Sequence, residues 1–491
     1  MNSKNSWTTR QRYRPYDEWP TEWVVRLDEK IADSRWRLGY HIQPQRGLLN
    51  DPNGFSYYNG KWHLFYQAYP MGPVHGIKSW YHLTSENLVD WQEEGLKLLP
   101  DSPYDSHGVY SGSAVPVGEE LFLAYTGNVR DKDWQRHSYQ LGAWMDQNGT
   151  VSKLSTPLLT APPAGYTQEF RDPQVFACDE GYLMVIGAQD QQENGQILTY
   201  FSQDLTTWEL RGELDFTSER MGFMVECPNL LFSKEQPLLL FCPQGLDPAV
   251  CNYQNIYPNS YVIGSRYDPA ANRITAASQL KNLDEGFDVY ATQGFNAPDG
   301  RILAVSWIGL PEIDYPSDAE GWAHCLSLVK ELTLEADGLH QRPARETTQL
   351  RSDTKTSLQG DSLLLDTVHN RYELQLEIPT DSHGSLLLFA DNAKKNGFRL
   401  TFDTVHGRIE LDRSAAGIPF AEAFGTTRSF SVAKGALQLQ IFVDTSVAEL
   451  FINDGRQTAT ARIFPEVDQR FLAVTCDKPV TGELWHLRTM R

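Results

Sequence analysis

A repeat of about 60 residues constrains the fold of this chain more than any other feature of its sequence. The segments 85–91 (SENLVDW) and 202–208 (SQDLTTW) share the pattern Ser-x-(Asn/Asp)-Leu-x-x-Trp. A second repeat consists of short apolar segments that each follow a polar residue, and these residues are Asp51, Ser111, Asp172, Glu226 and Asp288. The spacing predicts five copies of one structural unit, with these residues at equivalent positions.

Each unit has the composition of short β-strands. Runs of Val, Ile, Leu, Phe and Tyr are broken by Gly, Pro, Asn and Asp, and long helical patterns do not occur in this region. The clearest runs are WHLFYQ (62–67), LFLAYTG (121–127), YLMVIGA (182–188), LLLFC (238–242) and ILAVSW (302–307). We therefore expect an all-β chain with a five-bladed β-propeller over residues 35–345, in which equivalent positions ring the central axis. A large sandwich of antiparallel hairpins is the alternative.

The regions on either side of the propeller differ from it in pattern. Residues 346–491 contain alternating strands and a strong hairpin signal at 453–455 (NDG), and they predict a β-sandwich. The polar stretch 343–357 is typical of an interdomain linker. Residues 1–34 form an extension in which apolar residues recur at helical spacing over 21–32, so we expect a short helix that packs on the propeller.

Composition restricts the partners and the compartment. The chain has 491 residues and a formal net charge of -20, so it repels nucleic acid and anionic lipid, and an anionic substrate would need a local basic patch. No apolar run is long enough for a membrane span, no secretory signal is visible, and the six cysteines lack metal-type spacing. We expect a cytoplasmic enzyme; the oligomeric state stays open.

Three carboxylates of the repeat suggest the chemistry. Glycoside hydrolysis uses two carboxyl groups that flank the scissile bond, one as acid and the other as base or nucleophile. Each of Asp51, Asp172 and Glu226 could be a surface charge when taken alone. Their shared position in the repeat favours one common site, where neighbouring charges would raise the pKa of one group and make it the acid.

The motifs around these carboxylates resemble those of glycoside hydrolase family 32, the invertases and fructan hydrolases. The similar segments occur in the family's order, and they are LNDPNG (49–54), FYQ (65–67), YSGS (110–113), FRDP (170–173), ECP (226–228) and GFDVYA (286–291). The segment VDTSVAELFINDGRQTATARIFP is similar to that family's sandwich domain. The resemblance covers nearly the whole chain after about residue 35.

The resemblance implies a retaining β-fructofuranosidase. Asp51 would be the nucleophile, Glu226 the acid/base and Asp172 the group that stabilises the transition state, with about 5–5.5 Å between the carboxyl groups of Asp51 and Glu226. The substrate pocket would be lined by Leu48, Asn50, Gln67, Tyr110, Ser111, Arg171, Asp288, Tyr290 and Trp307. No metal or organic cofactor is implied, because the mechanism needs only carboxylates and water.

Residues His75 and Lys78 bear on the identity of the leaving group. The segment HGIKSW (75–80) resembles the version found in family members that act on sucrose 6-phosphate. His75 in place of an apolar aromatic residue, together with Lys78, would supply donors for a phosphate on the glucose 6-position. Two alternatives remain: a fructan or fructo-oligosaccharide hydrolase, and a carbohydrate-binding propeller without catalysis.

Overall fold

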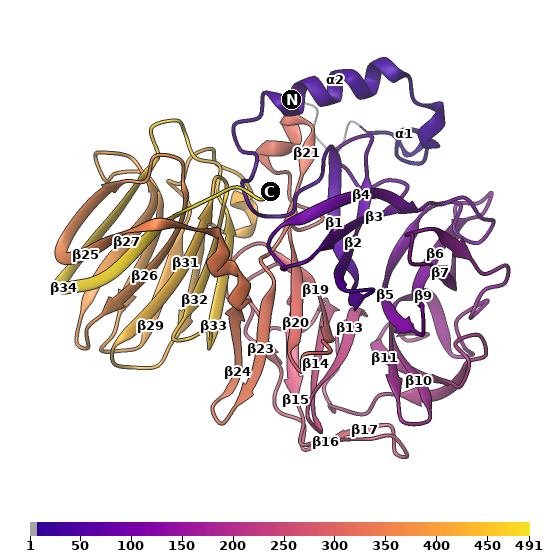
Figure 1. Cartoon of the computed structure of the whole chain (residues 1–491). Coiled ribbons are helices and arrows are strands. Elements are labelled where there is room, and N and C mark those ends of the chain that lie inside the picture. The colour runs from indigo at the N-terminus through magenta and orange to yellow at the C-terminus, as the bar shows by residue number, and fades with distance from the viewer. Residues whose placement is uncertain (1–6) are drawn as a thin grey trace.

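The computed structural model describes residues 7–491, which form a propeller and a sandwich that stand side by side (Figure 1). The first six residues of the predicted extension 1–34 lie outside the described residues. Within the described part, no helix has the length and apolar character needed to cross a membrane. The all-β prediction of a five-bladed propeller followed by a sandwich is confirmed.

Five antiparallel sheets make up the blades of the propeller. Blade I contains β1 (Gly47–Tyr58), β2 (Lys61–Tyr69), β3 (Ser79–Ser85) and β4 (Trp91–Leu98). Blade II contains β5 (Val109–Val117), β6 (Glu120–Arg130), β7 (Arg136–Met145) and β8 (Val151–Lys153). Blade III contains β9 (Tyr166–Cys178), β10 (Gly181–Asp190), β11 (Gly195–Ser202) and β12 (Glu209–Glu213). Blade IV contains β13 (Met224–Ser233), β14 (Gln236–Gln244), β15 (Ser260–Ile263) and β18 (Lys281–Asn282), and blade V contains β19 (Val289–Asn296), β20 (Ile302–Ile308), β23 (Lys330–Glu335) and β24 (Gly338–Pro343).

Short elements complete the propeller. The hairpin β16 (Arg266–Asp268) and β17 (Arg273–Thr275) extends from blade IV, and β22 (Cys325–Leu326) pairs with β20. The strand β21 (Trp322–Ala323) pairs in parallel with β1, so chain from the last blade joins the sheet of the first. The sequence explains the common turns, since Trp91 and Trp208 of the SxxLxxW repeat each donate an indole N–H to the carbonyl of the leucine three residues earlier.

A closed belt of hydrogen bonds holds the five innermost strands together. One polar side chain in each of these strands accepts a backbone N–H from the next blade, at 2.7 to 3.1 Å. The five pairs, given as acceptor and donor, are Asn53 with Gly112, Ser113 with Val175, Gln174 with Leu230, Asn229 with Gly294, and Gln293 with Phe55. The belt defines which residues of the five blades are equivalent.

Alignment of the five blades on the belt corrects the set of equivalent residues that the sequence repeat predicted. The residues two positions before the belt are Asp51, Ser111, Asp172, Cys227 and Ala291. Glu226 lies one residue earlier, and Asp288 lies three residues before Ala291. A β-bulge interrupts the pairing of each innermost strand near these positions. Because a bulge re-aims side chains, it turns the carboxylates of Asp51, Asp172 and Glu226 toward a common centre.

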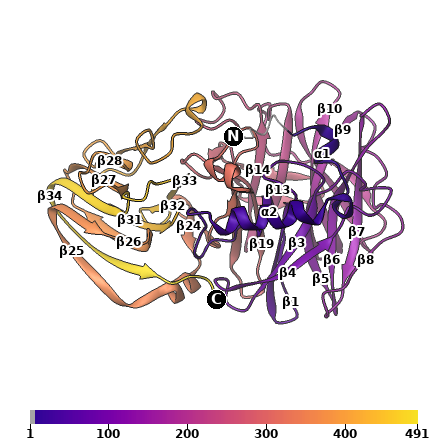
Figure 2. The same ribbon diagram turned by 90° about the horizontal axis from the view of Figure 1, so that it is seen from above.

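The N-terminal extension crosses one end of the propeller, as Figure 2 shows. It contains α1 (Thr9–Arg12), η2 (Tyr16–Glu18) and α2 (Thr21–Ala32). α2 spans the segment expected to be helical, and its Leu27 and Ile31 are buried in the apolar core that blades I and V share. Trp23 is 36% exposed, and its indole N–H donates to the carbonyl of Met71 at 2.9 Å.

The sandwich consists of two layers that share its longest strands. One layer contains β27 (His383–Ala390), β28 (Phe398–Asp403), β29 (Arg408–Asp412) and β30 (Thr427–Ser431), and the other contains β26 (Arg371–Ile378), β31 (Leu437–Asp444), β32 (Val447–Ile452) and β33 (Gln457–Arg462). The strand β34 (Phe471–Leu487) pairs with β27 along its first half and with β26 along its second. One apolar core fills the space between the layers.

The stretch 343–357 is only partly a linker, which corrects the sequence-based interpretation. It contains η4 (Arg345–Leu350) and the start of β25 (Arg351–Asp366), a strand that pairs with β34. Most side chains of β25 are exposed or half-buried, because the strand lies at an edge of the sandwich. An edge strand that faces solvent on both sides has no apolar alternation, so its sequence reads as a loop.

Buried polar contacts fix the sandwich against the propeller. His41, which precedes blade I, donates its two ring N–H groups to the carboxylates of Asp444 and Glu449 of the sandwich at 2.9 Å each. Asp284, between blades IV and V, accepts the Thr460 hydroxyl at 2.8 Å and the Thr460 backbone N–H at 3.0 Å. The remaining short helices are η3 (Pro316–Glu320) and η5 (Glu422–Phe424).

Candidate active site

Three donors surround the carboxylate of Asp51. The Ser111 hydroxyl donates to Oδ2 at 2.5 Å, and the Gln67 amide donates to the same oxygen at 3.3 Å. The Asn50 amide donates to Oδ1 at 3.1 Å and to the Gln67 side chain at 2.9 Å. These partners come from blades I and II, and they fix one orientation of the Asp51 carboxylate at the axis.

Asp172 lies beside the same axis and is 6% exposed. Its Oδ2 accepts the Cys227 backbone N–H at 3.0 Å, and the Cys227 thiol lies 3.6 Å from that oxygen and 4.0 Å from Oδ2 of Asp51. One thiol of blade IV therefore contacts carboxylates of blades I and III. Asp172 and Cys227 both have a positive φ, of 68° and 50°, which is the left-handed region that most side chains avoid. Strained backbone of this kind is concentrated at functional sites.

Glu226 is held from two sides. The Arg171 guanidinium donates to Oε1 through Nε at 3.0 Å and Nη2 at 2.8 Å, and the Tyr290 hydroxyl donates to Oε2 at 2.7 Å. Arg171 also binds Glu169. Arg171 on Oε1 and Tyr290 on Oε2 together fix the plane of the Glu226 carboxylate, whose side chain remains 17% exposed.

Burial dominates the electrostatics of the cluster. It raises the pKa of Asp172 to about 7, and the charges of Glu226 and Asp51 act in the same direction, against the opposing charge of Arg171. Burial also raises the pKa of Asp51, whereas the Ser111 hydrogen bond and the Lys78 charge lower it. Three carboxylates in one buried space cannot all ionise readily, so the site retains a proton near neutral pH.

Lys78 is close to the nucleophile's side of the cluster, and its role toward a phosphate stays a prediction. Its side chain is 3% exposed, and its ammonium donates to the Asn50 side chain. His75 is half-buried, and its ring lies 6.0 Å from that of Trp307 in an edge-on arrangement. The buried ammonium is thus committed to Asn50 and the charge of Asp51.

Two other residues expected in the pocket lie elsewhere, and this also corrects the sequence-based prediction. Leu48 is fully buried in an apolar cluster with Trp19 and Tyr69. The carboxylate of Asp288 is fully buried and accepts from Arg413 of the sandwich at 2.9 Å, from the Arg462 backbone N–H at 2.8 Å and from Tyr315 at 2.8 Å. It is out of the repeat register by three residues, so it faces the sandwich instead of the axis.

Of the remaining predicted residues, the structure brings Asn50, Gln67, Ser111, Arg171 and Tyr290 into contact with Asp51 or Glu226. Tyr110 lies at the rim, with the Arg136 guanidinium 6.0 Å from its ring centre. Trp307 is 2% exposed and contacts the ring of Tyr290 edge-on at 6.2 Å, so it packs under the site. A stacking role for Trp307 on a sugar stays a prediction.

Sequence reasoning missed Glu169, Cys227 and Arg136. Glu169 accepts from both Arg171 and Arg136, so it connects the acidic cluster to the rim. Its separation of two residues from Arg171 was an available signal, because such residues share one face of a strand. Nothing in the sequence paired Arg136 with Glu169, since the contact crosses from blade II to blade III.

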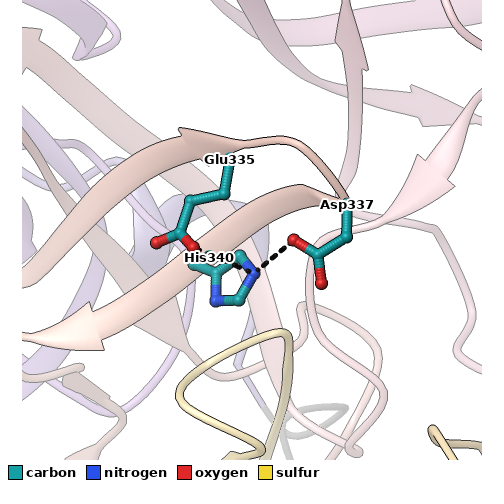
Figure 3. A group of neighbouring side chains, drawn as sticks. All are labelled: Glu335, Asp337 and His340. Atoms are coloured by element: carbon teal, nitrogen blue, oxygen red, sulfur yellow. Dashed lines mark hydrogen bonds and ion pairs between the residues drawn. The ribbon is translucent and has the colours of Figure 1, made fainter.

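A second group of possible metal ligands lies far from this cluster, on the β23–β24 hairpin (Figure 3). His340 Nε2 is 2.9 Å from Asp337 and 3.8 Å from Glu335. The two carboxylates are also paired with arginines, Glu335 with Arg342 at 2.6 Å and Asp337 with Arg456 at 3.2 Å. Arg342 also pairs with Asp454 of the sandwich, so the group belongs to an ion-pair network beside the sandwich.

The arrangement at the axis can cleave a glycosidic bond. It offers one carboxylate held by hydrogen bonds, one carboxyl group with its plane fixed by Arg171, and a third buried acid between them. Residues 41–343 match the model of the glycosyl hydrolases family 32 N-terminal domain, and residues 335–480 match the family 32 C-terminal domain. The chain belongs to glycosyl hydrolase family 32.

Proteins of known name match this chain over almost its full length. A sucrose-6-phosphate hydrolase of Pediococcus pentosaceus is 49% identical over 485 residues, which are 98% of this chain and 97% of that protein. The structure of sucrose-6-phosphate hydrolase from Lactobacillus gasseri superposes with a TM-score of 0.96 at 43% identity and covers 99% of this chain and 100% of that one. A GH32 β-fructofuranosidase of Bombyx mori superposes with a TM-score of 0.84 at 30% identity over 96% and 97% of the two chains.

Proposed function

We propose that this enzyme hydrolyses sucrose 6-phosphate, and also sucrose, to release fructose with retention of configuration. The observation that carries the proposal is the convergence of Asp51, Asp172 and Glu226 at the propeller axis, with a separate set of partners for each. The names of the relatives that match over the full length support the phosphorylated substrate.

Asp51 acts as the nucleophile in this mechanism. Its carboxylate attacks the anomeric carbon of the fructosyl unit and forms a covalent intermediate. A nucleophile must be ionised, and the hydrogen bonds from Ser111 and Asn50 together with the charge of Lys78 oppose the rise in the pKa of Asp51 that burial causes. These three residues are therefore positioning residues for the first step.

Glu226 acts as the acid and then as the base. It protonates the glycosidic oxygen as the bond breaks, and it later removes a proton from the water that releases fructose. Asp172 is placed to stabilise the positive charge that develops on the fructosyl ring. The mechanism requires about 5–5.5 Å between the carboxyl groups of Asp51 and Glu226.

We also propose that the enzyme works in the cytoplasm. All six cysteines are free, which fits a reducing compartment. A phosphorylated sugar that is made during uptake is met inside the cell. The proposed partner is thus a small fructoside, and the fructan alternative has less support, because relatives that match over nearly the full length carry the name sucrose-6-phosphate hydrolase.

A comparison of kcat/KM for sucrose 6-phosphate, sucrose and a short inulin-type oligosaccharide tests the substrate. We expect the phosphorylated sugar to be the best of the three. A higher value for the oligosaccharide would favour the fructan hydrolase instead. Proton NMR of the first fructose released tests the mechanism, since retention gives the β-furanose before mutarotation.

Asp51→Asn provides the matched test of the nucleophile, with Asp268→Asn at a half-buried position of the β16–β17 hairpin as the control. Loss of one member of a catalytic unit lowers kcat by about 10⁴-fold or more. Turnover of sucrose by Asp51→Asn at the rate of the control would overturn the assignment.

A further inference from the structure

A basic and aromatic patch lies on the rim of blade II, outside the carboxylate cluster. We call it the rim patch, and it consists of Tyr13, His107, Tyr110, Arg130, Trp134 and Arg136. The rings of Tyr13 and His107 pack against Trp134 at 5.1 and 5.6 Å, edge-on in both cases. Trp134 is 44% exposed, so the patch is open to solvent.

The two arginines of the rim patch stand directly opposite each other. Arg130 ends β6, Arg136 begins β7, and the two are paired across the antiparallel hairpin. Like charges at directly opposed positions destabilise a sheet. Arg136 has Glu169 as its counter-charge at 2.5 Å, whereas Arg130 has no ion pair within residues 7–491. The charge of Arg130 acts on Glu169, but that carboxylate already binds Arg136 and Arg171. In a protein with a net charge of -20, this concentration of arginines on one carboxylate suggests a bound anion.

The hydrogen-bonding capacity of these side chains is only partly used. Arg130 donates through Nη1 to the Trp134 carbonyl at 3.2 Å, and Arg136 donates through Nη1 to Glu169. The Nε atoms of both arginines are buried and have no protein partner in the described part of the chain. The Arg130 guanidinium lies 5.9 Å from the Trp134 ring, and that of Arg136 lies 6.0 Å from the Tyr110 ring. Aromatic faces of this kind hold a guanidinium while leaving its N–H edge available.

A chain of charged contacts joins the rim patch to the acid/base. Arg136 and Arg171 both donate to Glu169, and Arg171 donates to Glu226. The patch therefore lies on the side of the group that protonates the leaving oxygen. Arg130, Arg136 and Arg171 place three guanidinium groups on this side of the site, and clustered guanidinium groups bind phosphate dianions through charge-assisted hydrogen bonds.

We propose that Arg130 and Arg136, with the rings of Tyr13 and Trp134 beside them, form the subsite for the 6-phosphate of the glucosyl leaving group. This inference rests on the proposed function, and it moves the phosphate from Lys78, whose ammonium binds Asn50, to the blade II rim. Arginine suits this role because its fork binds two phosphate oxygens at once.

Arg130→Gln tests the subsite through the ratio of kcat/KM for sucrose 6-phosphate to that for sucrose. We expect the ratio to fall about 10- to 100-fold, because a hydrogen-bonded charge contributes roughly that much to binding. Lys132→Gln removes a positive charge from the same hairpin, at a side chain that is 90% exposed, and should leave the ratio unchanged. Arg136→Lys keeps the charge without the fork and should give an intermediate ratio.

Inhibition by glucose 6-phosphate provides a readout that does not depend on turnover of the phosphorylated substrate. With sucrose as substrate, Arg130→Gln should raise the inhibition constant of glucose 6-phosphate about 10-fold or more and should not raise that of glucose. A wild-type preference for sucrose 6-phosphate that survives in Arg130→Gln would overturn the subsite alone. A wild-type enzyme with no preference would overturn the proposed substrate as well.

Discussion

His41 connects the two domains through a contact that should titrate. Its ring lies between Asp444 and Glu449, and all three side chains are at most 1% exposed. Burial alone would lower its pKa, but the two carboxylates prevail and raise the pKa of His41 to about 9. A histidine whose pKa rises on folding contributes stability that is fully present below about pH 6.5 and is lost as the pH rises through about 9.

The contribution of His41 to stability follows from the rise in its pKa. The difference from the ordinary value of 6.5 corresponds to about 3 kcal/mol of free energy of unfolding. For a chain of 491 residues that unfolds as one unit, the entropy of unfolding is about 1 kcal/mol per kelvin, so the contribution equals about 3 °C in Tm. In His41→Gln, Asp444 keeps three backbone N–H donors at 2.7 to 3.0 Å but loses its cation.

Calorimetry of wild type and His41→Gln at pH 6.5, 8 and 9.5 measures this contribution. The Tm difference between the two proteins should be at least about 3 °C at pH 6.5 and should shrink as the pH approaches 9.5. His406→Gln is the matched control, because His406 pairs with Asp403 at 2.6 Å but is 70% exposed, and exposed pairs contribute little. A difference between wild type and His41→Gln that stays constant with pH would refute the reasoning.

Three further predictions concern the site and its surroundings. Ser111→Ala removes a hydrogen bond that lowers the pKa of Asp51, so the acidic limb of the kcat/KM profile for sucrose should move to higher pH; an unmoved limb would contradict the nucleophile's assignment. Lys78→Met should lower kcat/KM for sucrose and sucrose 6-phosphate by similar factors, and a selective loss with the phosphorylated sugar would restore its role as a phosphate ligand. Asp288→Asn leaves the buried Arg413 without its counter-charge and should lower the free energy of unfolding by about 3–5 kcal/mol, measured in urea, while KM for sucrose stays within about twofold; a large rise in KM would return Asp288 to the pocket.

The sequence contained enough to predict the blades and the acidic cluster, but not their exact register. Each blade repeats one apolar strand pattern, and local pattern is what single-sequence reasoning detects. Glu226 differs from Asp51 and Asp172 by one position relative to the belt, and the bulges that aim these three side chains leave no mark in the composition of the strands. The family resemblance supplied Glu226 regardless of register, whereas it misplaced Asp288.

Contacts between blades and between domains could not be predicted from the sequence, and the reason is physical. The pairing of Arg136 with Glu169, and of Asp288 with Arg413, joins residues from different blades or domains, and no periodicity in the chain encodes which ones meet. Lys78 was recognised as a cation near the site, but the direction of its side chain depends on burial. Its neighbour Asn50 could be identified only once the blades were assembled.

The strand β34 sets the order in which the chain can be completed during synthesis. It follows every other strand in the sequence, and it pairs with both layers of the sandwich and with β25. A chain in synthesis therefore still lacks the strand that joins the two layers when all five blades have been made. We expect the nascent protein to carry an open sandwich beside a largely formed propeller, with its apolar layers exposed to chaperones until β34 pairs.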